Sequence, residues 1–267
     1  MAKVDLTDEY ENGKYIPGAA DYPERWEDAA ADWRGVEHAI GRARLNQSYG
    51  SHERQQLDLF LPSGRPEGLI VFIHGGYWHK FDRKTWSHFA RGGTDAGWAV
   101  AMPSYRLAPE VRLAEITRDI ATAIEHAADL VSGPIRLTGH SAGGHLSARM
   151  NARGVLPDDV VARIARIVPI SPLSDLRPLM QTEMNATLGI DPEEAENESP
   201  ILNGARQGIS TEVWVGADER PAFLDQARWL DEAWDEASLR IAPGRHHFDV
   251  IDALADQTSP LMRSILA

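Results

Sequence analysis

Cysteine is absent from the 267 residues of this chain, which excludes disulfide bonds, thiolate zinc sites and iron–sulfur clusters. A chain without disulfides needs no oxidising compartment to fold, so we expect a cytoplasmic location. The amino-terminal segment lacks the apolar core of a secretory signal, and no apolar run approaches the roughly 20 residues that span a bilayer. We therefore expect neither export nor insertion into a membrane.

Basic residues are also scarce. There are 27 Lys and Arg against 40 Asp and Glu, giving a formal net charge of -13, which opposes binding to nucleic acid or to an anionic membrane surface. The sequence contains neither a glycine-rich nucleotide motif nor H-E-x-x-H, and shows no internal repeat. We predict no cofactor, no metal and no nucleic-acid partner.

Apolar residues, in contrast, are plentiful. They make up 43% of the chain, enough for one sizeable core, and we expect residues 1–267 to form a single domain. Short continuous apolar runs recur and are typical of strands buried on both faces of a parallel sheet. These predicted strands cover residues 69–73, 98–102, 135–139, 166–170, 212–216 and 238–242. Helical spacing between them indicates βαβ units, so the predicted fold class is α/β, with a mostly parallel sheet flanked by helices.

Three segments lie outside this alternation. Residues 43–50 and 54–62 have the pattern of two antiparallel strands joined through Gly50. Residues 1–40 are polar but contain several aromatic side chains, which predicts an arm packed on the domain rather than a disordered tail. Residues from about 172 to 210 combine prolines with an acidic run, and we expect a short irregular insertion that covers a site like a cap.

The strongest chemical motif follows the predicted strand 135–139. Residues 139–143 read GHSAG, a G-x-S-x-G pattern placed between a strand and a segment of helical composition. In a nucleophile elbow the serine occupies a strained turn, and the flanking glycines let strand and helix approach closely. The bare pattern occurs by chance, but its position between strand and helix predicts that Ser141 is a nucleophile.

A second glycine motif follows the early predicted strand 69–73. Residues 74–78 read HGGYW, and paired glycines allow backbone N–H groups to turn toward a nucleophile. We predict that Gly75 and Gly76, together with the amide of Ala142, form an oxyanion hole. The alternative is a tight turn between a strand and a helix.

A nucleophilic serine also needs a base and an acid, which are expected later in the chain. The strand 212–216 is followed by Asp218 and Glu219; we predict Asp218 as the acid and keep Glu219 as the alternative. An aspartate here would equally suit a helix N-cap. The strand 238–242 leads to His246 and His247, one of which must be the base.

The motifs HGGYW, GHSAGGHL, VGADERP and HHFDV together resemble the kynurenine formamidase (arylformamidase) branch of the α/β-hydrolases, from about residue 55 to residue 260. In that family the histidine before a phenylalanine is catalytic, so the resemblance selects His247 over His246. It implies a triad of Ser141, Asp218 and His247, and oxyanion positions at Gly75, Gly76 and Ala142.

Residues 105–110, YRLAPE, also resemble the hormone-sensitive-lipase-like esterases, which usually pair this segment with HGGG. Here Tyr77 and Trp78 stand in place of the third glycine, which favours the formamidase. An aryl substrate would suit stacking on Tyr77, Trp78, Tyr105 or Phe248, and the alternative for each is packing in the core. We predict Tyr77 and Trp78 as the substrate contacts.

The resemblance implies hydrolysis of N-formylkynurenine to kynurenine and formate through an acyl-enzyme. The first alternative is a carboxylesterase that acts on small acyl esters with identical machinery. The second is a catalytically silent binding module, since fold does not determine function. The expected partner is a small-molecule acyl or formyl donor, and the relatives also suggest a homodimer.

Overall fold

The computed structural model describes residues 6–267, in which eight strands form one sheet of order β1-β2-β4-β3-β5-β6-β7-β8. The β1–β2 and β2–β4 pairs are antiparallel and all the others are parallel. The strands are β1 (Ala43–Ser48), β2 (Gln56–Phe60), β3 (Leu69–Ile73), β4 (Ala99–Pro103), β5 (Ile135–His140), β6 (Ile164–Ile170), β7 (Ser210–Gly216) and β8 (Ala237–Ala242). The predicted mostly parallel sheet with an antiparallel pair at one side is confirmed.

Burial along the strands follows their position in the sheet. Every residue of β3 and β4 is buried, as their continuous apolar runs predict. Strand β8 differs, because only Ala242 is buried and Ile241 is 39% exposed. The apolar run 238–242 predicted a strand covered on both faces, but β8 pairs only with β7 and forms the edge of the sheet.

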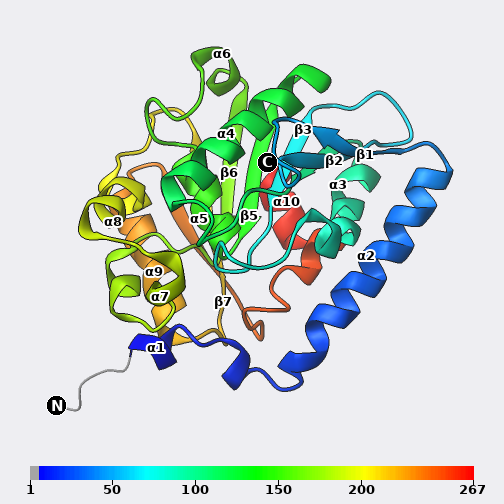
Figure 1. Cartoon of the computed structure of the whole chain (residues 1–267). Helices are drawn as coiled ribbons and strands as arrows, with labels where there is room; N and C mark the ends of the chain where they lie inside the picture. Colours follow the sequence, from blue (N-terminus) through cyan, green and yellow to red (C-terminus); the bar gives the residue numbers. More distant parts are fainter. Residues whose placement is uncertain (1–5) are drawn as a thin grey trace.

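Helices cover both faces of the sheet (Figure 1). One layer contains α4, α5 and α9, and the other contains α2, α3 and α10. The α-helices are α1 (Leu6–Glu9), α2 (Tyr22–Ala39), α3 (Arg91–Asp95), α4 (Leu113–Leu130), α5 (Ala142–Arg149), α6 (Asp158–Val161), α7 (Asn185–Leu188), α8 (Pro192–Glu198), α9 (Pro221–Ala233) and α10 (Pro260–Leu266). The 3₁₀ helices are η1 (Gly13–Tyr15), η2 (Ala19–Asp21), η3 (Arg83–Ala90), η4 (Arg177–Gln181), η5 (Pro200–Leu202) and η6 (Asp252–Ala255).

The amino-terminal residues from 6 onward run along one end of the sheet and then form α2, which packs on η3 and β1 (Figure 1). Trp26 of α2 lies against Trp86 of η3, with 4.6 Å between their ring centroids. The aromatic residues noted in the sequence therefore attach this segment to the domain. Residues 1–5 of the predicted arm lie outside the described residues.

The segment between β6 and β7 is more regular than its prolines suggest. It contains η4, α7, α8 and η5, and its residues Thr182, Glu183 and Met184 line the cavity described below. No helix within residues 6–267 combines the length and the apolar character that a membrane crossing requires.

Candidate active site

Ser141 occupies the turn between β5 and α5. Its backbone adopts φ 57° and ψ −117°, a strained conformation for a residue with a side chain. Two backbone hydrogen bonds hold the turn: the N–H of Ser141 donates to the carbonyl of Ile170 at 2.8 Å, and the N–H of His145 donates to the carbonyl of Ser141 at 2.9 Å. This is the geometry of a nucleophile elbow.

The glycines on either side explain why the motif takes this form. A Cβ atom on Gly143 would lie 1.9 Å from the carbonyl oxygen of Ile73, and one on Gly139 would lie 2.3 Å from the carbonyl oxygen of Gly143. Backbone atoms cannot move aside as a flexible side chain can. The backbones of β3, β5 and α5 can therefore approach this closely only because residues 139 and 143 are glycines.

His247 supplies an imidazole to the same cavity and is held by Glu219. Nδ1 of His247 lies 2.6 Å from Oε2 of Glu219. The other carboxylate oxygen of Glu219 accepts hydrogen bonds from the Ser171 hydroxyl at 2.5 Å and from the Gly216 N–H at 2.8 Å. Because a carboxylate can only accept, Nδ1 carries the hydrogen and Nε2 is left to act as a base.

The position of Glu219 corrects the predicted acid. Asp218 is exposed, and its backbone N–H donates to the carbonyl of Arg245 at 2.9 Å. The turn after β7 directs the side chain of Asp218 outward and that of Glu219 inward, where it is only 6% exposed. Asp218 is not a helix cap either, since the residue before α9 is Arg220. The acid of the constellation is therefore the alternative, Glu219.

The two neighbouring histidines have different surroundings. Nε2 of His246 lies 3.2 Å from the Tyr22 hydroxyl, and its Nδ1 accepts backbone hydrogen bonds from Phe248 and Asp249. His246 thus joins its loop to α2, whereas the carboxylate of Glu219 contacts His247.

The ring of His247 is packed between two others. Its centroid lies 4.4 Å from that of Phe223 and 4.6 Å from that of His140. Burial holds the pKa of His140 well below the usual range, so this second imidazole is neutral. Sequence reasoning missed Phe223, because its apolar spacing in α9 is that of an ordinary core residue.

The HGGYW loop passes directly beside the serine. A Cβ atom on Gly75 would lie 3.2 Å from Cβ of Ser141 and 2.9 Å from the carbonyl oxygen of His140. Gly76, Tyr77 and Trp78 have successive positive φ angles of 112°, 49° and 58°. Ala142 is the first residue of α5, where an N–H has no acceptor within the helix. Gly75 and Ala142 therefore lie next to Ser141, and Gly76 lines the same cavity.

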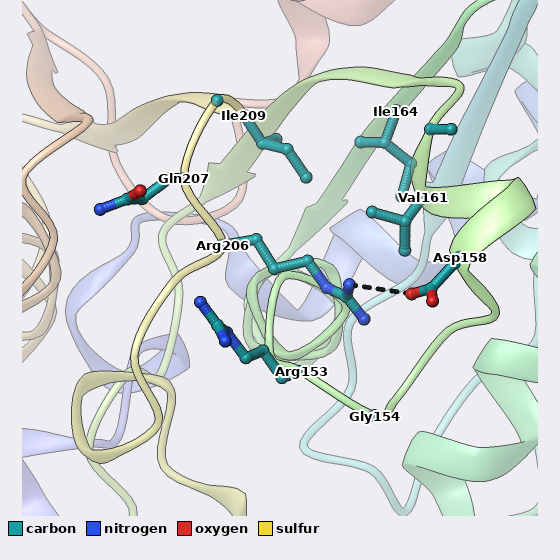
Figure 2. Close-up of a pocket in the computed structure, with 10 residues that line it drawn as sticks. Arg153, Gly154, Asp158, Val161, Ile164, Arg206, Gln207 and Ile209 are labelled. Atoms are coloured by element: carbon teal, nitrogen blue, oxygen red, sulfur yellow. Dashed lines mark hydrogen bonds and ion pairs between the residues drawn. The ribbon is translucent and has the colours of Figure 1, made fainter.

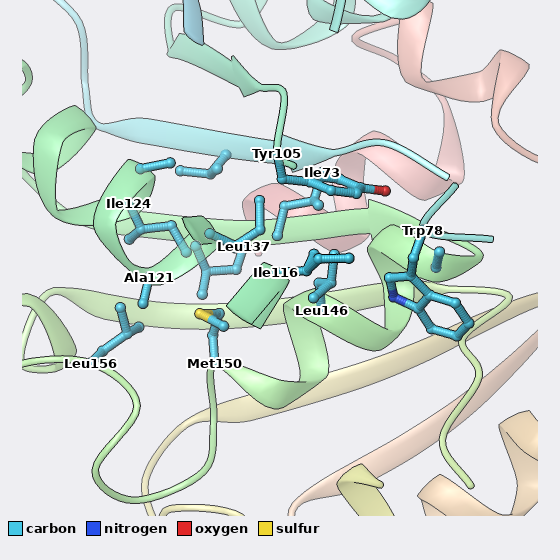
Figure 3. Close-up of a cluster of buried hydrophobic side chains, with 14 of the residues drawn as sticks. Ile73, Trp78, Tyr105, Ile116, Ala121, Ile124, Leu137, Leu146, Met150 and Leu156 are labelled. Atoms are coloured by element: carbon cyan, nitrogen blue, oxygen red, sulfur yellow. The ribbon is translucent and has the colours of Figure 1, made fainter. Parts of the chain in front are cut away.

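The two aromatic residues of this loop point to different places. Tyr77 lines the cavity, and its hydroxyl donates to the carbonyl of Tyr10 at 2.6 Å. Trp78 is fully buried within the hydrophobic cluster that also holds Leu146 and Ile116 (Figure 3). The prediction that Trp78 contacts substrate is wrong, because the sharp turn carries it into the core under α5.

The cavity at Ser141 has a volume of about 1030 Å³ and is also lined by His140 and His247. Its lining is strongly aromatic, from Tyr10, Trp26, Tyr77, Phe81, Trp86 and Phe248. A separate hollow of about 610 Å³ lies between α6 and the loop before β7, with Arg153 and Arg206 opposite Asp158 (Figure 2). It shares no lining residue with the cavity at Ser141.

A mostly parallel sheet with a strained serine after β5, a carboxylate after β7 and a histidine after β8 defines a serine hydrolase of the α/β-hydrolase class. Residues 57–207 match the family model described as BD-FAE, and the chain belongs to this family.

Solved structures have a similar fold. A protein from a Silicibacter species, provisionally described as a thioesterase, is 56% identical, covers 99% of this chain and 100% of its own, and superposes with a TM-score of 0.96. Esterase B from Lactobacillus rhamnosis is 20% identical, covers 92% of each chain and has a TM-score of 0.66, a likeness of fold.

Curated relatives include the kynurenine formamidase of Danio rerio, 26% identical over 249 residues that span 87% of this chain and 84% of the relative. The kynurenine formamidase of Salmo salar is 27% identical over 250 residues, with the same coverage. Together these findings make the chain an enzyme of the α/β-hydrolase type, acting on acyl or formyl groups.

Proposed function

We propose that this chain hydrolyses N-formylkynurenine to kynurenine and formate. The observation that carries this proposal is the cavity of about 1030 Å³ at Ser141, whose aromatic lining suits an aryl leaving group. Lys80 also lines the cavity and is our candidate partner for the carboxylate of the amino-acid portion. The similarity to two fish kynurenine formamidases supports the same substrate.

In the first half of the proposed reaction, Ser141 Oγ attacks the formyl carbon and passes its proton to Nε2 of His247. The negative charge on the formyl oxygen is met by backbone N–H groups of the HGGYW loop and of Ala142. The C–N bond then breaks, the same proton moves to the aniline nitrogen, and kynurenine leaves a formyl ester on Ser141.

In the second half, His247 takes a proton from water, and the resulting hydroxide attacks the formyl ester. The ester bond breaks, the proton returns to Ser141 Oγ, and formate is released. Throughout, Glu219 keeps the hydrogen of His247 on Nδ1, so Nε2 remains able to accept and return the proton.

Hydrolysis of small acyl esters or thioesters is the competing proposal. The triad and the oxyanion loop would serve it equally, and the relative from Silicibacter is provisionally described as a thioesterase. The two proposals differ only in the group that occupies the cavity. A silent binding module is disfavoured, because such a protein would not need an intact serine, histidine and carboxylate set.

The test compares kcat/KM for N-formylkynurenine and p-nitrophenyl acetate in wild type and Ser141→Ala. Preference for the formyl amide, lost in the variant, is the expected result. Turnover of the ester alone would support the competing proposal. Activity that survives in Ser141→Ala would show that the nucleophile is wrong.

A further inference from the structure

The amino-terminal arm, through its residues 6–23, forms one wall of the cavity at Ser141. Arg220 attaches it to the body of the protein: the guanidinium contacts Asp8 at 3.2 Å and Glu9 at 2.8 Å, and lies 3.8 Å from the ring centroid of Tyr15. Arg220 directly follows Glu219 in sequence. The arm is therefore fastened to the turn that carries the carboxylate of the triad, although it lies outside the residues matched by the family model.

Asn12 is a buried polar side chain in this wall, only 6% exposed. Its Nδ2 lies 3.5 Å from the hydroxyl oxygen of Tyr77, at the outer limit of a hydrogen bond. That hydroxyl donates its own hydrogen to the carbonyl of Tyr10, so toward Asn12 it can only accept. This sets the orientation of the amide. No residue among 6–267 donates a hydrogen bond to Oδ1 of Asn12, and Oδ1 does not belong to the fully buried polar atoms, so it is open to a donor from outside the protein.

Two hollows meet at Asn12. The larger is the cavity at Ser141, and the smaller, about 220 Å³, lies between the arm and the turn that bears Glu219. The residues common to both linings are Asn12 and His247. Asn12 thus borders the same space as the imidazole of His247.

We propose that Oδ1 of Asn12 accepts a hydrogen bond from the N–H of the scissile amide, so that the site selects amides over esters of the same shape. This inference rests on the proposed formamidase function. When Ser141 attacks, the lone pair that develops on the leaving nitrogen must face His247 to receive its proton. The nitrogen's own hydrogen must then point elsewhere, and Asn12 supplies its acceptor.

An ester places an oxygen at the same position, which has no hydrogen to donate. The side-chain oxygen of Asn12 would then face the lone pairs of the ester oxygen and lack a donor. This unpaired contact would weaken binding of the ester in the transition state. Asn12 is accordingly a specificity-determining residue, located in a part of the chain that carries none of the recognised catalytic motifs.

The experiment compares formanilide with phenyl formate, which differ only in the N–H or O of the leaving group. We expect Asn12→Leu to lower kcat/KM for formanilide by about tenfold, and to change that for phenyl formate by less than about twofold. Asn197→Leu, an exposed position on α8, is the distant control and should change neither value.

A variant that weakens the packing of the arm but keeps Asn12 distinguishes a role in amide-over-ester selectivity from a structural role in the cavity wall. Tyr10→Phe removes the hydroxyl that accepts a hydrogen bond from Gln226 at 2.8 Å and leaves Asn12 in place. It should lower kcat/KM for both substrates by the same factor, so that the amide-to-ester ratio of kcat/KM stays at its wild-type value.

Equal losses on both substrates in Asn12→Leu, or no loss on either, would overturn the inference. Failure of the proposed function has a different signature, visible before any variant is made: wild type would cleave phenyl formate but neither formanilide nor N-formylkynurenine. In that case there is no amide selection for Asn12 to provide, and the inference fails with it. If wild type cleaves formanilide but not N-formylkynurenine, only the proposed substrate fails.

Discussion

The turn after β7 presents two adjacent carboxylates, and replacing each one separately tests which of them supports His247. Glu219→Gln preserves the size of the side chain and removes its charge. Asp218→Asn makes the matching change one residue earlier, on a side chain that is exposed. The structure predicts a large loss of kcat for Glu219→Gln and almost none for Asp218→Asn.

The size of the effect follows from the partners of Glu219. Its Oε1 accepts hydrogen bonds from Ser171 and from the Gly216 N–H, so a glutamine must keep its carbonyl oxygen at that position. Its NH₂ group then replaces Oε2 and points at Nδ1 of His247, at a distance of 2.6 Å in the native protein. His247 can satisfy this donor only by moving its own hydrogen to Nε2, where it can no longer accept the serine proton. In serine proteases the equivalent change lowers kcat by about 10⁴.

The assay is kcat for the best substrate found, with the midpoint of thermal unfolding as the control for folding. We expect Glu219→Gln to lose at least about 10³ in kcat. Asp218→Asn should remain within about twofold of wild type, as is usual for exposed positions. A greater loss in Asp218→Asn than in Glu219→Gln would refute the assignment of Glu219.

Two further predictions concern stability. Gly143→Ala should lower the free energy of unfolding by at least about 3 kcal/mol or prevent folding, because its Cβ would lie 1.9 Å from the Ile73 carbonyl oxygen. Gly35→Ala in α2, where a Cβ meets nothing within 4 Å, is the control in urea denaturation and should not destabilise. Burial lowers the pKa of His74 and of His145 from 6.5 to about 4, so both are neutral in the folded protein. The unfolded chain protonates first, and the free energy of unfolding should therefore fall as pH drops from 6.5 toward 4, by up to about 3 kcal/mol for each histidine. Urea titrations of wild type and His145→Gln at several pH values in this range give the dependence of the unfolding free energy on pH. The prediction would be contradicted if that dependence were as steep in the variant as in wild type.

Several features of the protein could be predicted from the sequence because they depend on residues close together in the chain. The apolar runs at 69–73 and 135–139 indicate buried strands, and the glycines of GHSAG indicate a turn too tight for side chains. The fold class follows from the alternation of such runs with helical patterns, and it is confirmed. Ser141 was identified in the same way, whereas the family resemblance was needed to select His247 over His246; the two residues line one cavity.

Other features depend on contacts between segments distant in sequence, and only the tertiary structure decided them. The sequence favoured Asp218 as the acid, with Glu219 as the alternative, because it did not show that Ser171 and Gly216 would bind Glu219 and hold it inward. Tyr77 and Trp78 looked equivalent, but one faces the cavity and the other fills the core under α5.

The arm is the clearest case of this division. Its aromatic residues indicated packing on the domain, but the sequence contained no sign that Tyr10 and Asn12 would border the cavity beside His247. The sequence alone therefore determined the local chemistry, namely a nucleophile in a strained turn and the strands that carry it. The shape and polarity of the cavity were decided only when the arm folded back against Tyr77 and Arg220, because burial and hydrogen bonding there join residues more than 60 positions apart.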